Sequence, residues 1–318
     1  MKADKTNMSR ISNRSVVDEN DFWKLRQFLI DTWPQMPPFY NWETRRLDGS
    51  YFHNERAGWE TRWEGGKAAR VWEAANGQLV GAVHPEGKGQ AWLEVHQDYR
   101  HLEAEMLDWA EAHLAQPNKA SAMGLKVFAW EYDTRRQKLL ASRGYQRMSS
   151  GDILREKPYD GKPIVVPSMP MGYRLHCVRP GHAEDCKRYA ELLNASFKRT
   201  FHKAQELVTF TTQSPSFRSE LELVAVAPDG KFAALAGMIY DEDNRFGSFE
   251  PVCATPGPRP LGLTGILMLE GYRRVRELGA EHCYVGTGTG MAANRFYAAV
   301  GFKIIHTGWF WVKETKIG

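Results

Sequence analysis

A turn rich in proline and glycine links an expected strand to an expected helix in the C-terminal half. It reads Ala-Thr-Pro-Gly-Pro-Arg-Pro-Leu-Gly-Leu-Thr-Gly over residues 254–265. The first N–H groups of a helix have no partner inside the helix and carry the positive end of its dipole, so small residues there let a phosphate reach the backbone. Arg259 adds a fixed positive charge and Thr264 adds a hydroxyl donor. The sequence therefore predicts that a phosphate-bearing ligand binds at this turn.

The same turn resembles a known cofactor-binding signature. Arg259-Pro260-Leu261-Gly262-Leu263-Thr264 is similar to the pyrophosphate-binding motif of the GNAT superfamily of N-acyltransferases, Arg/Gln-x-x-Gly-x-Gly/Ala. Two positions depart from it, because Thr264 replaces the last small residue and Pro260 removes one backbone donor. The resemblance implies that a CoA pyrophosphate binds here. The cofactor-binding residues that it implies in the turn are Arg259, Leu261, Gly262, Leu263, Thr264 and Gly265.

A second segment also resembles this superfamily. In Ala-Asn-Arg-Phe-Tyr-Ala-Ala-Val-Gly-Phe, Tyr297 stands four residues before Gly301-Phe302. The resemblance implies that the Tyr297 hydroxyl lies near the thioester sulfur, contacts the cofactor and protonates the leaving thiolate. A phenol with a pKa near ~10 is a reasonable acid for that step. Asn294, one turn before Tyr297, is expected to replace the asparagine that the family usually carries. The alternative is that Tyr297 is only a core residue of an amphipathic helix.

The strand before the turn, Gly-Ser-Phe-Glu-Pro-Val-Cys-Ala-Thr, supplies the remaining expected site residues. By resemblance, the backbone of Val252, Cys253 and Ala254 would pair with the pantetheine arm as an added strand does. A backbone N–H there would also polarise the thioester carbonyl. Glu250 would take a proton from the incoming ammonium, although a solvated glutamate at a strand end is the alternative. A covalent acyl-cysteine is disfavoured, because no histidine lies in a recognisable partnering motif.

The elements that must position these residues follow from the apolar patterning. The helix expected over 263–278 places apolar residues on one face and charged residues on the other. In the C-terminal half we expect strands at about 171–178, 246–254, 281–287 and 302–313, a hairpin at 221–240, and helices at about 182–197, 263–278 and 291–300. Strands that alternate with helices and hairpins predict an α/β domain with a mixed sheet.

An internal repeat suggests that the chain contains this domain twice. Three landmarks recur in the same order and at nearly the same offset: a hairpin turn, an arginine before a long helix, and a glycine that closes a short helix. The pairs are Gly77 and Gly230, Arg100 and Arg259, and Gly144 and Gly301. We therefore expect an α/β protein of two tandem GNAT-like domains, each a mixed, mostly antiparallel sheet flanked by helices. The expected boundaries are 1–157, a linker at 158–171, and a catalytic domain at 172–318.

The first copy lacks the features that would bind and cleave a thioester. Glu103 stands where Gly262 stands in the second copy, and Leu140 replaces Tyr297. A carboxylate repels a pyrophosphate in a confined loop, and a leucine cannot donate a proton. We expect the N-terminal copy to bind no CoA and to serve as a structural half or as a wall of the acceptor pocket.

Composition limits the partners and the compartment. The chain has 318 residues with a net charge of +4, 42% hydrophobic and 25% charged residues. That charge is too small to indicate nucleic acid, and no apolar run approaches the ~20 residues that a membrane span needs. The four cysteines form no Cys-x-x-Cys pair, so we expect reduced thiols, no bound metal and a cytoplasmic protein. The oligomeric state is expected to be a monomer or a homodimer.

The predicted function is an N-acetyltransferase that moves an acetyl group from acetyl-CoA to a primary amine by direct attack. The acceptor would be a small molecule or a peptide. One alternative is a non-catalytic acyl-CoA sensor, which would keep the turn but would not need Tyr297 or Glu250. Another is an aminoacyl-tRNA-dependent transferase, which should carry a basic stripe and needs no CoA turn.

Overall fold

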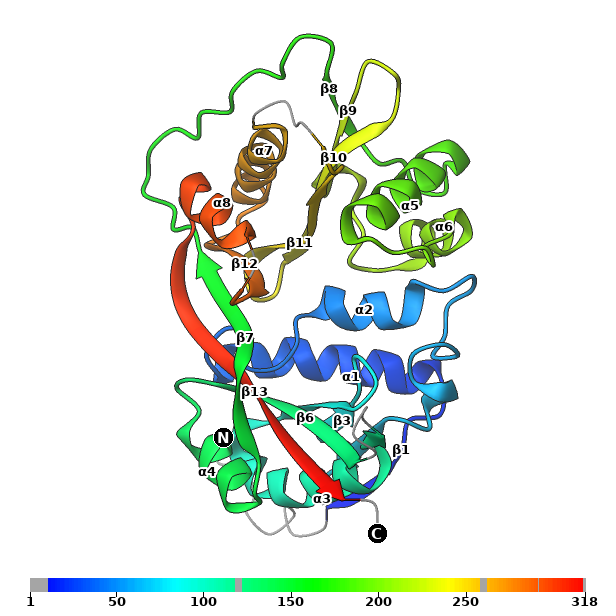
Figure 1. Cartoon of the computed structure of the whole chain (residues 1–318), viewed down its shortest axis with the longest axis vertical. Helices are drawn as coiled ribbons and strands as arrows, with labels where there is room; N and C mark the ends of the chain where they lie inside the picture. The colour runs from blue at the N-terminus through cyan, green and yellow to red at the C-terminus, as the bar shows by residue number, and fades with distance from the viewer. Residues whose placement is uncertain (1–10, 118–121, 258–261, 291, 317–318) are drawn as a thin grey trace. The chain divides into compact units, whose positions relative to one another are not determined.

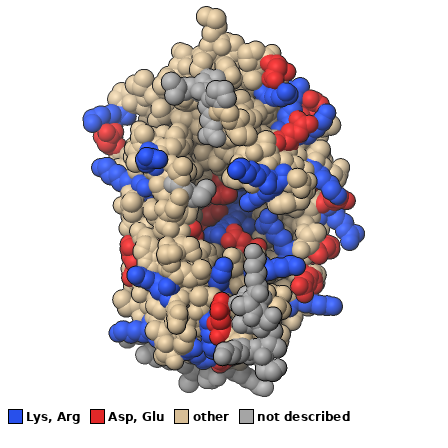
Figure 2. Space-filling view, viewed as in Figure 1, with Lys and Arg blue, Asp and Glu red and all other residues tan. Residues whose placement is uncertain are grey.

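The computed structural model describes residues 11–117, 122–257, 262–290 and 292–316. No helix within these residues is long and apolar enough to cross a membrane. On the face in view, Lys and Arg side chains are interleaved with Asp and Glu side chains (Figure 2).

The chain folds as two compact units, and each unit is assembled from more than one segment. The N-terminal unit contains residues 1–50, 58–153 and 306–318, and the C-terminal unit contains residues 51–57 and 154–305. This division differs from a linear boundary because of the last strand, β13 (Lys303–Lys316). From Gly308 onward, β13 pairs antiparallel with β6 (Ala122–Trp130). The final strand of the chain therefore completes the sheet of the N-terminal unit.

The N-terminal unit is a mixed sheet with helices. Its helices are α1 (Glu19–Thr32), α2 (Thr44–Phe52), which runs on into residues of the other unit, α3 (Glu103–His113) and α4 (Thr134–Ser142). Its strands besides β6 are β1 (Ser12–Ser15), β2 (Arg70–Glu73), β3 (Leu79–His84), β4 (Gln90–Val95), β5 (Gln116–Pro117) and β7 (Gln146–Glu156). The order β1-β2-β3-β4-β6-β13 is antiparallel except for the parallel pair β4–β6.

The C-terminal unit has the same architecture. Its strands are β8 (Arg174–Cys177), β9 (Glu222–Val226), β10 (Phe232–Asp241), β11 (Phe246–Ala254) and β12 (His282–Gly288). Its helices are α5 (Ala183–Phe197), α6 (Ala204–Gln213), α7 (Leu263–Glu277) and α8 (Ala293–Val300). Strands β8 to β11 are antiparallel neighbours, and β11 pairs parallel with β12. The predicted fold class is confirmed, because each unit is a mostly antiparallel mixed sheet flanked by helices.

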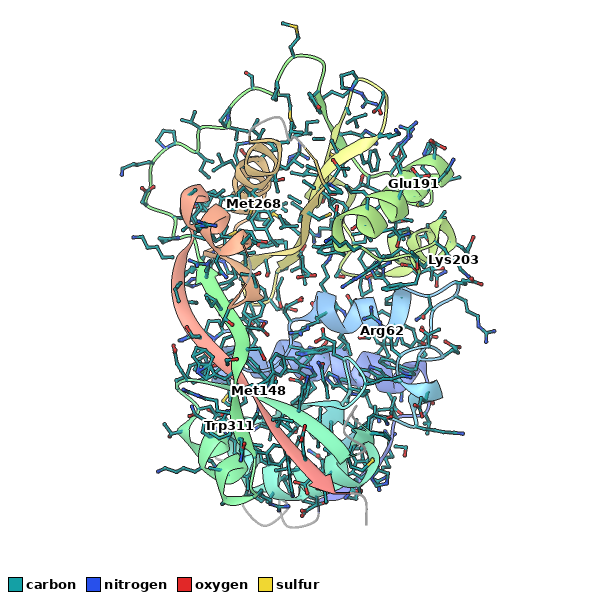
Figure 3. The ribbon with its side chains drawn as sticks, viewed as in Figure 1. Arg62, Met148, Glu191, Lys203, Met268 and Trp311 are labelled. Carbon is teal, nitrogen blue, oxygen red and sulfur yellow. The ribbon has the colours of Figure 1, made fainter. Side chains whose placement is uncertain are left out.

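Alternation along the strands divides the C-terminal unit into two cores. Leu223 and Ala225 of β9 point to the side of α7 and α8, whereas Val224 and Val226 point to the side of α5 and α6. The two helix pairs accordingly cover opposite faces of the sheet (Figure 1). Met268 of α7 is fully buried in the first of these layers (Figure 3). The layer of α7 and α8 is the one that holds the candidate site.

The internal repeat predicted from the sequence is present in the structure. In both halves of the chain the order is strand, two helices, three strands, helix, strand, helix and strand, with the short β5 as an addition in the first half and β13 as the last strand of the second. Gly77 and Gly230 both take positive φ in their hairpin turns, and Gly144 and Gly301 both do so after the short helix. The landmark glycines thus mark equivalent backbone positions in the two units.

Helix α6 was not expected from the sequence. Its segment Val-Thr-Phe-Thr-Thr alternates apolar and β-branched polar residues, a pattern typical of a strand. The threonines fit a helix because their hydroxyls donate back to the preceding turn: Thr209 to the Gln205 carbonyl at 3.2 Å and Thr212 to the Val208 carbonyl at 2.7 Å. Packing of Leu207 and Phe210 against the core then decides for the helix.

Candidate functional site

The centre of the candidate site is the C-terminal part of β11. Its first residues pair with β12 from Phe246–His282 to Phe249–Val285, and in the described part of the chain this parallel ladder ends there. On its other side, β11 stays paired with β10 as far as Ala254, with a shift of register between Ala236 and Met238. An irregularity of this kind bends a strand away from a neighbour. The backbone of residues 252–254 is therefore placed to accept an extended ligand as an additional strand.

The N-terminus of α7 follows this strand edge along the chain. Gly262 is its N-cap with a φ of +95°, and no side chain of the described residues caps the helix. A Cβ atom added at Gly262 would have no neighbour within 4 Å among the described residues. Leu263 is buried, whereas Thr264 is half-buried at the surface of the first turn. This terminus can receive an anion through free backbone N–H groups and the helix dipole.

Two of the predicted cofactor-binding residues lie in the part of the turn, 258–261, that is outside the described residues. Arg259 and Leu261 lie outside the described residues, so their predicted roles toward the pyrophosphate stay predictions. Gly265 lies within the described residues, and its role in the packing of the helices differs from that of Gly262. A Cβ there would meet Phe296 and Val300 at 3.8 Å each, so this glycine marks close packing of α7 against α8.

Tyr297 lies on α8 inside the α7–α8 core and is only 5% exposed. Its hydroxyl makes no hydrogen bond with any residue that the structure describes. Burial raises the pKa of Tyr297 well above its ordinary value, and the nearby Glu250 carboxylate and Cys253 thiol raise it further. The phenol is therefore a weaker acid than the sequence alone suggested, and it keeps its proton throughout the neutral and mildly alkaline range.

Glu250 and Cys253 lie on β11 but differ in environment. Glu250 is exposed at the point where β11 leaves β12, and its carboxylate contributes to the raised pKa of Tyr297. Cys253 is buried in the core of α5 and α6, whereas Val252 and Ala254 pack against the core of α7 and α8. Cys253 therefore contributes backbone and not its thiol to the α7–α8 side, and all four cysteines are free.

Asn294 has a structural role that the sequence did not indicate. Its amide nitrogen donates to the carbonyls of Gly288 at 2.9 Å and Thr289 at 3.2 Å, at the end of β12. Its amide oxygen accepts from the Arg155 guanidinium at 3.2 Å. These bonds anchor the start of α8 and engage both ends of the side-chain amide. A direct contact of Asn294 with a cofactor stays a prediction.

Sequence reasoning missed two residues that hold the site together. Arg155, at the end of β7, is 6% exposed and contacts both ends of α8. Ser196 of α5 donates to the Ala254 carbonyl at 2.9 Å and fixes the end of β11. Neither residue lies in a motif, because each acts through a partner that is distant in the sequence.

In the N-terminal unit, the equivalent turn is closed by ion pairs. Arg100 contacts Glu103 at 2.5 Å and Asp133 at 2.6 Å, and Arg136 contacts Glu103 at 3.0 Å. Burial opposes ionisation of both carboxyls, but the two arginines hold the pKa values of Glu103 and Asp133 below their usual range. Arg100, the counterpart of Arg259, is therefore neutralised inside the protein. Leu140, the counterpart of Tyr297, is buried in the core.

No group of three or more His, Cys, Asp or Glu among the described residues is arranged to hold a metal ion.

Comparisons with known proteins agree with this architecture. No protein-family model matches the chain, and no curated protein matches it in sequence. A GCN5-related N-acetyltransferase from Sphaerobacter thermophilus superposes with a TM-score of 0.62 at 18% identity, covering 98% of this chain and 97% of that one. A tandem GNAT protein from the clavulanic acid biosynthesis pathway superposes with a TM-score of 0.63 at 17% identity, covering 97% and 100%. A GNAT-family acetyltransferase from Colwellia psychrerythraea gives a TM-score of 0.56 at 13% identity, covering 95% and 100%. The chain therefore has the tandem GNAT fold.

Proposed function

We propose that the C-terminal unit is an acyltransferase that moves an acyl group, with acetyl as the first expectation, from CoA to a primary amine. The observation that carries the proposal is the continuity of two features. The edge of β11 that β12 leaves unpaired is followed along the chain by the N-terminus of α7, which no side chain of the described residues caps. An extended amide-bearing arm that ends in a pyrophosphate fits this order of groups: the backbone of Val252–Ala254 would hold the arm, and the start of α7 would hold the phosphates.

The residues around that edge support transfer and not only binding. The acceptor amine would attack the acyl carbonyl, so that a C–N bond forms and the C–S bond breaks. Glu250 is exposed at the edge and would take the proton that the amine loses, directly or through water. Tyr297 would give its proton to the leaving sulfur and regain one from solvent. Its raised pKa keeps that proton in place at neutral pH.

The test is release of free CoA thiol from acetyl-CoA in the presence of a panel of amines, including amino acids, polyamines, aminoglycosides and peptides. We expect at least one amine to increase thiol release above the rate with water alone. A protein that binds acetyl-CoA in calorimetry, but releases no thiol with any amine or with water, would be a sensor and would refute the proposal.

A matched pair of variants distinguishes loss of the proposed acid from a general effect of removing a tyrosine hydroxyl. Tyr297→Phe removes the hydroxyl that we assign to the acid. Tyr240→Phe removes a hydroxyl of the same unit that donates to the Leu278 carbonyl at 2.8 Å, away from the β11 edge. We expect turnover to fall only in Tyr297→Phe.

A further inference from the structure

Arg155 makes an unusual set of contacts for a buried guanidinium. It lies at the end of β7, in the part of that strand that belongs to the C-terminal unit. One terminal nitrogen donates to the Asn294 side chain at 3.2 Å and the other donates to the Phe302 carbonyl at 3.4 Å. Asn294 is in the first turn of α8, and Phe302 follows its C-cap, Gly301. One side chain therefore links the two ends of the helix that carries Tyr297.

The charge of Arg155 has no carboxylate partner within ion-pair distance among the described residues. Its Nε atom is also buried without a hydrogen-bond partner. Removing a guanidinium from water without a counter-ion is unfavourable, and an apolar side chain of similar size would stabilise such a position better. The contacts of Arg155 therefore contribute little to stability, whereas they are well suited to fixing the positions of Asn294 and Phe302.

Helix α8 needs anchors of this kind. It has eight residues, and an isolated helix of that length is not stable in water. Asn294 ties its start to the carbonyls of Gly288 and Thr289. Lys157 donates to the Val300 carbonyl at 2.9 Å and holds its last turn. Arg155 contacts both regions and so fixes the position of the helix between them.

We propose that Arg155 is a positioning residue that sets where the Tyr297 hydroxyl lies relative to the edge of β11. This inference rests on the proposed function. Arg155 acts through geometry and not through its field, since the pKa of Tyr297 is set by burial, Glu250 and Cys253. A shift of about 1 Å in a reacting group is enough to lower a rate by about 100-fold.

The test uses the full chain and thiol release from acetyl-CoA with water as the acceptor, so no amine needs to be known. In Arg155→Met we expect turnover to fall by about tenfold or more, while KM for acetyl-CoA stays within about twofold. The decisive comparison repeats the substitution in Tyr297→Phe. There Arg155→Met should cause almost no further loss, because the hydroxyl that it positions is gone.

Lys157→Met is the matched control. It removes a cation that directly follows β7, bonds the last turn of α8 and lies over the Tyr272 ring, without a contact to the start of α8 among the described residues. We expect it to lower turnover by less than about twofold. An equal loss in Lys157→Met would mean that general fraying of α8 is responsible, and an equal loss from Arg155→Met in both tyrosine backgrounds would mean that Arg155 does not act through Tyr297. Either result overturns the positioning role and leaves the acyltransferase proposal standing. Absence of thiol release from the wild-type protein, with water and with every amine of the panel, would overturn both.

Hydrogen exchange on the protein without any acyl-CoA gives a readout independent of activity. In Arg155→Met we expect faster exchange in residues 293–302 and unchanged exchange in α7. Faster exchange throughout the unit would show a merely structural role and would contradict the inference. If Arg155→Met does not fold, Arg155→Lys, which can keep only one of the two contacts, is expected to show the same pattern with a smaller loss.

Discussion

The sharpest prediction concerns charge at Gly262, the N-cap of α7. We compare Gly262→Ala, Gly262→Asn and Gly262→Asp. All three side chains begin at a Cβ that meets no described atom within 4 Å. All three must adopt a φ of +95°, which costs a residue other than glycine roughly 1–2 kcal/mol, with Asn and Asp the more tolerant. The Asn and Asp variants therefore share shape and strain, and they differ in one negative charge.

The magnitude follows from Coulomb's law. Two unit charges about 5 Å apart repel by roughly 1–3 kcal/mol at effective dielectric constants between about 80 and 20. Gly262→Asp should therefore bind CoA about 5- to 150-fold more weakly than Gly262→Asn. For stability the sign is opposite. A negative charge at a helix N-terminus is favourable by about 0.3–1 kcal/mol, so the Asp variant should unfold at the same or a slightly higher temperature than the Asn variant.

Isothermal titration calorimetry with CoA measures the affinities, and thermal unfolding without ligand measures the stabilities. Raising the salt concentration from 0.05 to 0.5 M should reduce the difference between Asp and Asn, because salt screens exposed charges. Equal CoA affinity in the Asn and Asp variants at low salt would show that no phosphate approaches Gly262. That result would refute the assignment of the α7 terminus to the cofactor.

Three further predictions follow from other parts of the molecule. Tyr297→Phe should lower turnover by more than about tenfold with little change in CoA affinity, and wild-type turnover should show no loss from ionisation of this phenol between pH 8 and 10, because its pKa is raised; equal turnover with chemistry rate-limiting would remove Tyr297 from the mechanism. CoA should bind once per chain, so Arg100→Met should leave the stoichiometry and the affinity in calorimetry unchanged, and a second site that disappears in Arg100→Met would contradict this. The same variant should lower the free energy of unfolding by about 3 kcal/mol, since buried Glu103 and Asp133 each lose a partner. Burial alone would raise the pKa of Glu206, but hydrogen bonds with His202 and His53 lower it from 4.5 to about 2. The stability that the ionised carboxylate contributes is therefore present above pH ~4.5 and falls by about 2 kcal/mol between pH 5 and 3. The free energies of unfolding in urea of the wild type and Glu206→Gln should converge over that interval, and a constant difference between them would be incompatible with the lowered pKa.

The sequence was most informative where local rules act. Helix α7 was expected at 263–278 and lies at Leu263–Glu277, because its apolar stripe and the glycines at both ends act within a few residues of one another. The strand expected at 246–254 matches β11 (Phe246–Ala254), since a short apolar run before a turn is a local signal too. Gly262 could be predicted as a special position for the same reason, as only a positive φ starts the helix at that point.

Features that depend on distant partners were not predictable in this way. The last strand, β13, joins the sheet of the N-terminal unit because it pairs with β6, and the sequence of a single strand does not indicate which strand it will pair with. The role of Arg155 depends on Asn294 and Phe302, which lie in another part of the chain and give no pattern with it. The formation of helix α6 depends on the packing of Leu207 and Phe210 into the core, which their local sequence does not indicate.

Glu103 shows how the structure changes the reason behind an expectation. From the sequence, its carboxylate was expected to repel a pyrophosphate in the first copy. In the structure that charge is already balanced by Arg100 and Arg136, so simple repulsion is not what closes the site. Arg100 is instead turned inward to Glu103 and Asp133, with its guanidinium over the ring of Tyr40. To bind a phosphate, this arginine would have to leave two buried carboxylates, and both would then depend on Arg136 alone, at 3.0 Å from Glu103 and 3.7 Å from Asp133. We therefore expect the N-terminal copy to bind no anion at this turn, because its own ion pairs hold Arg100.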